Sequence, residues 1–165
     1  MIDQAARHSQ PFAIPPFQRS TRPSPCIPAL LQPAEVTQYR QMEAAFRASG
    51  GIVSADEVVS MLNRHTDQPI SQLARWIVDH RVLSFQWRSG TKLPLFQFDL
   101  PSMVPRSRVV AVISELVPAL SDWEVCLWLV TPNAWLAEAK PFEELDQNAS
   151  AVIDAARAER YLLRG

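Results

Sequence analysis

The sequence predicts a mainly α-helical protein with one small β-hairpin. Apolar residues recur three and four positions apart along much of the chain, which is the spacing of one helix face. The exception is the stretch at residues 82–98, where alternating apolar and polar residues flank a short polar turn. The chain has 165 residues, of which 47% are hydrophobic, enough to bury a core in one domain or two small subdomains.

Residues 1–33 differ in composition from the rest of the chain. They hold seven of the fourteen prolines and few aliphatic residues, which is typical of a disordered or extended tail. Arg7, Arg19 and Arg22 could contact phosphates, although the composition favours a solvated linker.

Three helices are predicted between residues 33 and 80. The first covers residues 33–48 and is ended by a pair of glycines. Ser54 and Glu57 have the spacing of a capping box, so the second helix is predicted to begin directly after Ser54. The third helix is predicted over residues 70–80, with Pro69 in its first turn.

The hairpin is predicted from two strands, at residues 82–87 and 92–98, joined by a turn at residues 88–91. Proline cannot donate a hydrogen bond to a neighbouring strand, so Pro94 predicts that the returning strand lies at a sheet edge. Phe96 and Phe98 at its end are expected in the core rather than on nucleic-acid bases.

Two short helices, a connecting turn and a hairpin are the pattern of a winged helix-turn-helix, so residues 34–104 are predicted to bind DNA. The second helix would enter the major groove, where Gln and Arg can pair with base edges, while other cations contact phosphates. The alternative is a packing module whose polar residues are only solvated. The candidate base-reading residues are Ser71, Gln72 and Arg75, and the candidate phosphate contacts are Arg64, Arg88 and Lys92.

Residues 105–165 are predicted to form a helical domain. An apolar stripe runs over residues 109–120, and residues 123–130 are apolar nearly all round, as in a central buried helix. Pro141 fits the opening of a short helix. Asn148 could cap a last helix, in which Leu162 and Leu163 belong to the predicted apolar side.

The segment from Trp128 to Leu136 reads Trp-Leu-Val-Thr-Pro-Asn-Ala-Trp-Leu, and Pro-Phe-Glu-Glu-Leu follows at residues 141–145. This order resembles the C-terminal toxin-binding domain of the bacterial Xre/MbcA/ParS-like antitoxins, in which a similar pattern links short helices. The resemblance covers about a third of the chain and extends more loosely from Gly50 onward. The family usually has glycine where residues 137–140 of this chain are Ala-Glu-Ala-Lys.

The resemblance implies that residues 105–165 bind a partner toxin, commonly a RES-type enzyme that consumes NAD, with the last residues reaching into its active site. Trp, Tyr and Arg are the residue types that make dense contacts at interfaces. The alternatives are that the Trp-Leu pair belongs to the core and that the final residues are an ordinary frayed terminus. The residues implied to bind the toxin are Trp135, Leu136, Arg160, Tyr161, Arg164 and Gly165.

The net charge of −1 conceals an asymmetry along the chain. Residues 1–108 carry twelve Lys and Arg against eight Asp and Glu, a net charge of +4, whereas residues 109–165 carry four against nine, a net charge of −5. A basic first part can approach phosphates, and an acidic last part could dock on a basic protein. The alternative is that these charges only keep both parts solvated.

The sequence gives little support for catalysis, so a non-enzymatic protein without cofactor or metal is predicted. The three His residues are scattered, and four glycines are too few for the usual phosphate-binding loops. Cys26 and Cys126 have no metal or redox spacing, which favours a reduced, cytoplasmic protein. Neither a signal peptide nor a membrane span is indicated.

Together these features predict an antitoxin that neutralises a cognate toxin and represses its own operon by binding operator DNA. The alternative is a stand-alone DNA-binding regulator, or a protein-interaction adaptor, without a toxin. Symmetric operators favour homodimers, although the sequence has no heptad or other dimer signature.

Overall fold

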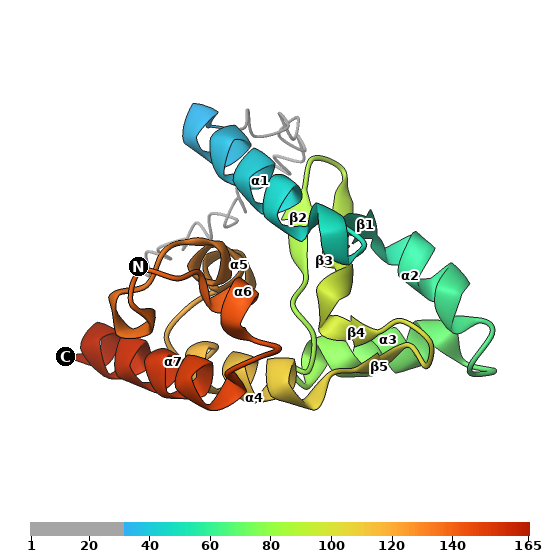
Figure 1. Ribbon diagram of the computed structural model, residues 1–165. Helices are drawn as coiled ribbons and strands as arrows, with labels where there is room; N and C mark the ends of the chain where they lie inside the picture. Colours follow the sequence, from blue (N-terminus) through green and yellow to red (C-terminus); the bar gives the residue numbers. More distant parts are fainter. Residues whose placement is uncertain (1–31) are drawn as a thin grey trace, which may run out of the picture. The chain divides into compact units, whose positions relative to one another are not determined.

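The structure, a computed structural model, describes residues 32–165 and is mainly helical with small antiparallel sheets (Figure 1). It confirms the fold class predicted from the sequence. The predicted disordered segment of residues 1–33 lies outside the described residues except for its last two. None of the helices in residues 32–165 is long and apolar enough to span a membrane.

The first part of the described chain has the order helix, strand, helix, helix, strand, strand. The strand between the first two helices was not predicted, because three residues are too few to show an alternating pattern. The elements are α1 (Pro33–Phe46), the 3₁₀ turn η1 (Arg47–Ser49), β1 (Ile52–Ser54), α2 (Ala55–Leu62), α3 (Pro69–Val78), β2 (Phe85–Trp87) and β3 (Gly90–Pro94).

The glycine pair predicted to end the first helix does so through its backbone conformation. Gly50 has a φ angle of 100° and Gly51 one of 76°, both in the left-handed region that favours glycine. A Cβ atom on Gly50 would also lie 2.9 Å from the Cβ atom of Leu95. Position 50 therefore requires glycine for two independent reasons.

The predicted capping box at the start of α2 is confirmed. The Ser54 hydroxyl accepts a hydrogen bond from the Glu57 backbone N–H at 3.3 Å, and the Glu57 carboxylate accepts one from the Ser54 N–H at 2.7 Å. These hydrogen bonds hold the pKa of Glu57 below its ordinary value, chiefly through the backbone N–H. The same motif, which the sequence analysis missed, starts a later helix at Ser121 and Glu124.

The three strands form an antiparallel sheet in the order β1-β3-β2, so the prediction that the strand containing Pro94 lies at an edge is wrong. Pro94 is tolerated in the central strand because it is the last residue of β3, opposite Ile52. The ladder is continued by the next residue, since the Leu95 N–H donates to the Gly51 carbonyl at 2.9 Å.

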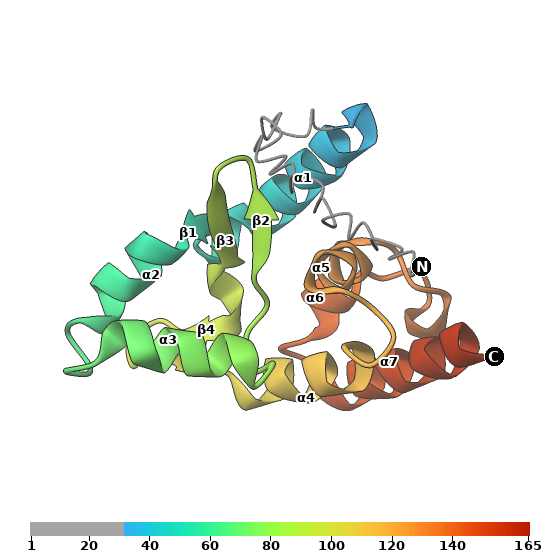
Figure 2. The same ribbon diagram turned by 180° about the vertical axis from the view of Figure 1, so that it is seen from behind.

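The predicted returning strand at residues 92–98 ends early, because the chain turns into a 3₁₀ segment directly after β3. A second, two-stranded sheet and four helices follow, as Figure 2 shows from behind. These elements are η2 (Leu95–Gln97), β4 (Phe98–Asp99), β5 (Val104–Pro105), α4 (Ser107–Leu116), α5 (Asp122–Val130), η3 (Ala134–Leu136), α6 (Pro141–Glu144) and α7 (Ala149–Arg164).

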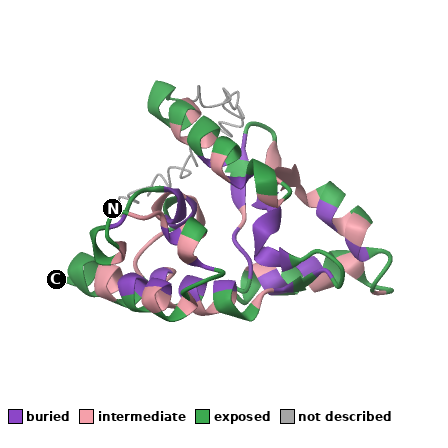
Figure 3. Cartoon of the chain, in the orientation of Figure 1, coloured by how far each residue is buried: buried purple, intermediate pink, exposed green. Residues whose placement is uncertain are grey.

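The buried side chains form two clusters (Figure 3). The larger cluster joins α1 and the sheet to α4, α5 and α7, so its members lie on both sides of the boundary predicted after residue 104. The smaller cluster packs α2 and α3 against β3. Phe96 belongs to the larger cluster and Phe98 to the smaller one, which confirms that these aromatic residues are in the core.

The last helix, α7, differs from its prediction at both ends. Asn148 precedes the helix, but its side chain makes no capping hydrogen bond. Its buried side consists of Val152, Ala155 and Ala156, whose small volumes allow α7 to pack along α4. The prediction that Leu162 and Leu163 belong to this side is wrong: both are exposed, because the core ends before the last turn of α7.

Candidate functional site

The last turn of α7 and the η3 segment together carry a group of exposed apolar side chains. Tyr161 is 81% exposed, Trp135 64% and Leu162 63%, and Leu163 is also exposed. Trp135 and Leu162 line one pocket of about 370 Å³, although they are 27 positions apart in the sequence. We call Trp135, Tyr161, Leu162 and Leu163 the C-terminal face; of the four, Trp135 and Leu162 line the same pocket, while Tyr161 and Leu163 point to either side of Leu162 on the helix.

A short loop without glycine positions Trp135. The Asn133 side chain accepts a hydrogen bond from the Trp135 backbone N–H at 2.9 Å, and the Asn133 N–H donates to the Ala139 carbonyl at 3.1 Å. Ala137 and Glu138 both adopt left-handed conformations, with φ angles of 53° and 66°. The turn at these two residues therefore forms without glycine, at a cost of about 1 kcal/mol for each left-handed residue.

The two residues of the Trp-Leu pair, Trp135 and Leu136, differ in burial. The alternative that Trp135 belongs to the core is wrong, since most of its side chain faces solvent. Leu136, its neighbour, is partly buried against the larger core cluster. The structure therefore separates the Trp-Leu pair into one exposed residue and one packing residue.

Glu115 of α4 forms ion pairs with two arginines of α7, Arg157 and Arg160. Its carboxylate lies 3.0 Å from Nη2 of Arg157 and 2.7 Å from Nη1 of Arg160. The Arg160 contact is an ion pair without hydrogen-bond geometry, which leaves the buried Oε2 atom of Glu115 without a hydrogen-bond donor among residues 32–165. Arg160, a candidate toxin-binding residue, is thus engaged within the protein and fixes α7 on α4.

The remaining candidates of this region lie at the end of α7. Nη2 of Arg164 donates to the Pro118 carbonyl at 3.3 Å, and both Arg164 and Gly165 are exposed. Trp128 and Glu159 also line the pocket beside Trp135. The indole N–H of Trp128 is buried and has no acceptor within the described part of the chain.

The candidate DNA-reading helix, α3, packs on α2 through Leu73 and Trp76, which leaves its opposite side exposed. Ser71 and Arg75 lie on this exposed side, and Arg64 is exposed in the turn before α3, whereas Gln72 is half-buried.

The same side of α3 also carries large apolar residues that the sequence analysis missed. Ile70 is 71% exposed and Val78 75% exposed. Their spacing of eight positions, two helical turns, could have placed them opposite Leu73 and Trp76.

The candidate phosphate contacts of the hairpin lie away from α3. In both Figure 1 and Figure 2 the turn between β2 and β3 is at the end of the sheet opposite α3. Arg88 is exposed in this turn, with a left-handed φ angle of 55°, and Lys92 lies in β3 opposite Phe85. The structure therefore brings Ser71 and Arg75 together on one helix and Arg88 and Lys92 together at the hairpin, but it does not join the two groups.

Residues 32–165 contain no group of three His, Cys, Asp or Glu side chains placed to hold a metal ion. Cys126 is fully buried, and burial raises the pKa of its thiol far above the ordinary value. Comparisons with protein-family models, with curated proteins and with solved structures find no match to this chain.

Proposed function

We propose that this protein is an antitoxin-like protein, which binds a cognate toxin through the C-terminal face and neutralises the toxin by covering its active site. The observation that carries the proposal is the exposure of Trp135 and Leu162 around one pocket. A cluster of large exposed apolar side chains is typical of a protein-binding site. The resemblance of residues 128–145 to the toxin-binding domain of Xre/MbcA/ParS-like antitoxins supports the same assignment.

The C-terminal face contains residue types that are common at the centres of protein–protein interfaces. Tryptophan and tyrosine are the side chains most often found at energetic hot spots, because they bury a large rigid area at a small entropic cost. Trp135 is held by the hydrogen bond between its backbone and the Asn133 side chain, so little order has to be gained on binding. The last turn of α7 presents Tyr161 and Leu162 as a narrow projection that fits a cleft.

Charge indicates what kind of surface the toxin presents. Residues 109–165 have a net charge of −5, and Arg157 and Arg160 are already paired with carboxylates inside this region. A basic surface around an apolar cleft is therefore the complementary partner. A RES-type enzyme that consumes NAD is the toxin class that the family resemblance implies, and binding of its active-site entrance would account for neutralisation.

The second candidate function is DNA binding by the first part of the chain, either to repress the operon of the antitoxin or as the whole function of a stand-alone regulator. The observation that favours it is the α2-turn-α3 unit, whose exposed side carries Ser71 and Arg75 with Arg64 in the preceding turn. None of these arginines forms an ion pair with a carboxylate of residues 32–165. They are therefore free to contact phosphates or base edges.

The proposal is tested by co-expression of the full chain with the protein encoded next to it in its own genome, in a bacterial host. The expected result is that the neighbouring protein alone stops growth and depletes NAD, and that co-expression restores both. Purification of the pair should then give a stoichiometric complex. A neighbouring protein that is not toxic, or whose toxicity is unchanged by co-expression, would exclude this antitoxin pair and favour the DNA-binding regulator.

A further inference from the structure

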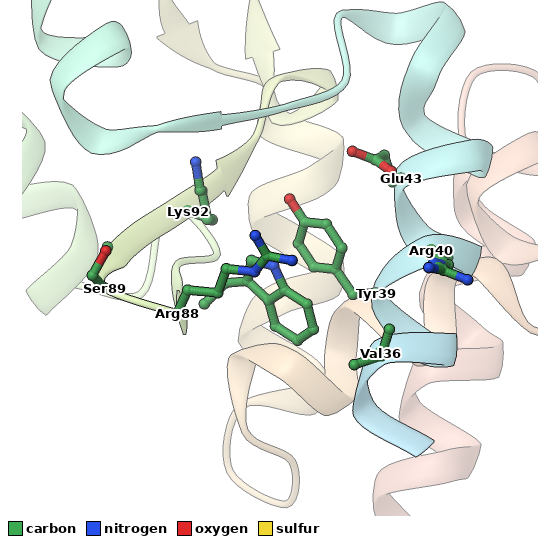
Figure 4. A pocket seen from close by; sticks show the side chains of 9 residues that line it. Val36, Tyr39, Arg40, Glu43, Arg88, Ser89 and Lys92 are labelled. Atoms are coloured by element: carbon green, nitrogen blue, oxygen red, sulfur yellow. The ribbon is translucent and has the colours of Figure 1, made fainter. Parts of the chain in front are cut away.

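A pocket of about 450 Å³ lies between α1 and the β2-β3 hairpin, away from the C-terminal face. α1 contributes Tyr39, Arg40 and Glu43, which lie within about one turn of each other, and the hairpin contributes Arg88 and Lys92. In Figure 4 the Arg88 side chain extends from the hairpin toward the Tyr39 side chain, which reaches across from α1, while Lys92 stands apart on the neighbouring strand. The pocket is therefore built from two elements that are distant in the sequence.

A stack of aromatic rings forms the wall of this pocket. The Tyr39 and Trp87 rings are parallel, with their centroids 4.1 Å apart and their planes within 3°. The Trp87 ring also stacks on Trp123, with centroids 5.7 Å apart, and the Trp123 indole N–H donates to the Gln38 side chain at 3.1 Å. Because every ring is fixed by a neighbour, the wall is rigid and ready to receive a ligand.

The lining of the pocket carries more cationic than acidic side chains. Arg40, Arg88 and Lys92 form no ion pair with any carboxylate of the described residues, and Glu43 is the one acidic residue among the pocket's lining. Glu57 lies near enough for the charge of Lys92 to lower its pKa, and with both carboxylates counted the site keeps a net positive charge. Burial and the nearby Glu43 raise the pKa of Tyr39, and its phenol O–H can donate a hydrogen bond to a ligand.

We propose that this pocket binds a small phosphomonoester, a molecule of about mononucleotide size with a terminal phosphate. A terminal phosphate carries about −1.5 to −2 charges at pH 7, which favours a site with a net positive charge. Arg88 and Lys92 supply the guanidinium and ammonium donors that phosphate oxygens accept. The pocket volume is much larger than a phosphate ion needs, and it lies within the range of small-molecule sites, so the organic part lies along the aromatic wall.

This inference is independent of toxin binding, because the pocket shares no residue with the C-terminal face. It also differs from a contact with a DNA backbone. A phosphodiester carries a single charge and continues on both sides, whereas the pocket offers the guanidinium of Arg88 and the ammonium of Lys92 and is bounded by α1 and by the hairpin.

The test is isothermal titration calorimetry of the full chain with three phosphomonoesters, AMP, GMP and glucose 6-phosphate. Adenosine tests the need for phosphate, and the dinucleoside monophosphate ApA tests an internal phosphodiester. We expect at least one phosphomonoester to bind with a Kd on the order of 0.1–1 mM. Adenosine and ApA should bind at least tenfold more weakly than AMP if AMP is that ligand, and the NMR signal of the Trp87 indole N–H should shift on binding.

Charge reversal locates the site. The double variant Arg88→Asp, Lys92→Glu should weaken binding at least tenfold, and aspartate is chosen at position 88 because it tolerates the left-handed backbone there. The matched control Arg47→Glu, Arg81→Glu changes the net charge equally at exposed positions outside the pocket and should change binding less than twofold. If the double variant is unfolded by circular dichroism, Arg40→Glu on the exposed side of α1 replaces it.

Three results would overturn the inference. The first is the absence of saturable binding for all three phosphomonoesters. The second is an equal loss of affinity in the control pair, which would show attraction to net charge alone. The third is ApA binding as tightly as AMP, which would indicate a nucleic-acid backbone instead.

Discussion

The side-chain amide of Gln97 pairs with the backbone of Leu83 in both directions. Its Oε1 atom accepts a hydrogen bond from the Leu83 N–H at 2.6 Å, and its Nε2 atom donates to the Leu83 carbonyl at 3.0 Å. Gln97 is fully buried, and its own carbonyl accepts from the Arg106 N–H at 2.8 Å. One glutamine thus joins the segment before β2 to the connection that leads into α4.

The first prediction concerns this glutamine. Replacing Gln97 by alanine should lower the free energy of unfolding by about 3 kcal/mol, because it leaves a buried N–H and a buried carbonyl unsatisfied and opens a cavity. Urea denaturation followed by circular dichroism measures the loss. Gln86→Ala is the control, since Gln86 is exposed and bonds only the Thr91 hydroxyl, and it should cost less than about 1 kcal/mol. Equal losses in the two variants would contradict this role for Gln97.

The second prediction concerns the loop that carries Trp135. Ala137 is exposed and left-handed, so Ala137→Gly should raise the free energy of unfolding by about 1 kcal/mol by relieving a steric cost. Replacing Ala44, an exposed residue inside α1, by glycine should lower the free energy of unfolding by about 1 kcal/mol. Thermal unfolding of both variants gives the comparison, and destabilisation by Ala137→Gly would show that the loop conformation is not strained.

The local signals in the sequence were sufficient for most of the helices. The capping box of Ser54, the stop at Gly50 and the apolar spacing each act within a few residues, so they can be recognised without knowledge of the fold. The position of the Pro94 strand within the sheet could not be recognised from local signals, because a strand is central or at an edge only relative to strands elsewhere in the chain. The strands that were not predicted include β1, whose three residues pair with β3 and show no pattern of their own, and the two-residue strand β5.

The candidate surfaces could be predicted only in part. The resemblance pointed to Trp135, but its exposure depends on where Asn133 and the left-handed Ala137 turn the chain. Leu162 was expected on the apolar side of the last helix, and only the packing of α7 on α4 reveals that the core ends before this residue. The pocket beside Tyr39 joins α1 to the hairpin, and no spacing within either element indicates that contact.

The third prediction is a pH dependence that arises from the second capping box. Hydrogen bonds from the Ser121 hydroxyl and backbone N–H lower the pKa of Glu124 in the folded protein. The ionised Glu124 carboxylate therefore stabilises the folded protein fully above the unfolded pKa of about 4.3. This stabilisation is lost as the pH falls through the pKa of Glu124 in the folded protein. The effect is small because Glu124 is exposed to solvent.

Two variants measure this effect. Glu124→Gln should reduce the loss of stability between pH 7 and pH 3, whereas Ser121→Ala should cost about 1 kcal/mol at pH 7. Glu138→Gln is the control, because no hydrogen bond to the Glu138 carboxylate exists among residues 32–165. An unchanged acid dependence in Glu124→Gln would exclude the capping box as its source.

The fourth prediction separates DNA binding from toxin binding. Arg75→Glu should weaken binding to operator DNA at least tenfold, because it removes a contact worth about 1–3 kcal/mol and adds repulsion from the phosphates. Capture of the toxin should be unchanged, since Arg75 lies on α3 and not on the C-terminal face. Electrophoretic mobility shifts and co-purification report the two activities. An equal loss of both would refute this division of labour, and Arg47→Glu controls for net charge.

The fifth prediction tests the central claim most directly, by measuring neutralisation of the toxin with variants of the C-terminal face. Trp135→Ala and Leu162→Asp should each weaken toxin binding by about 30-fold or more, the loss of an interface hot spot, while unfolding stability changes by less than about 0.5 kcal/mol. Leu100→Ala, an exposed apolar residue outside the face, should leave neutralisation intact. If Trp135→Ala and Leu162→Asp neutralise the toxin as well as Leu100→Ala does, the C-terminal face is not the toxin-binding site.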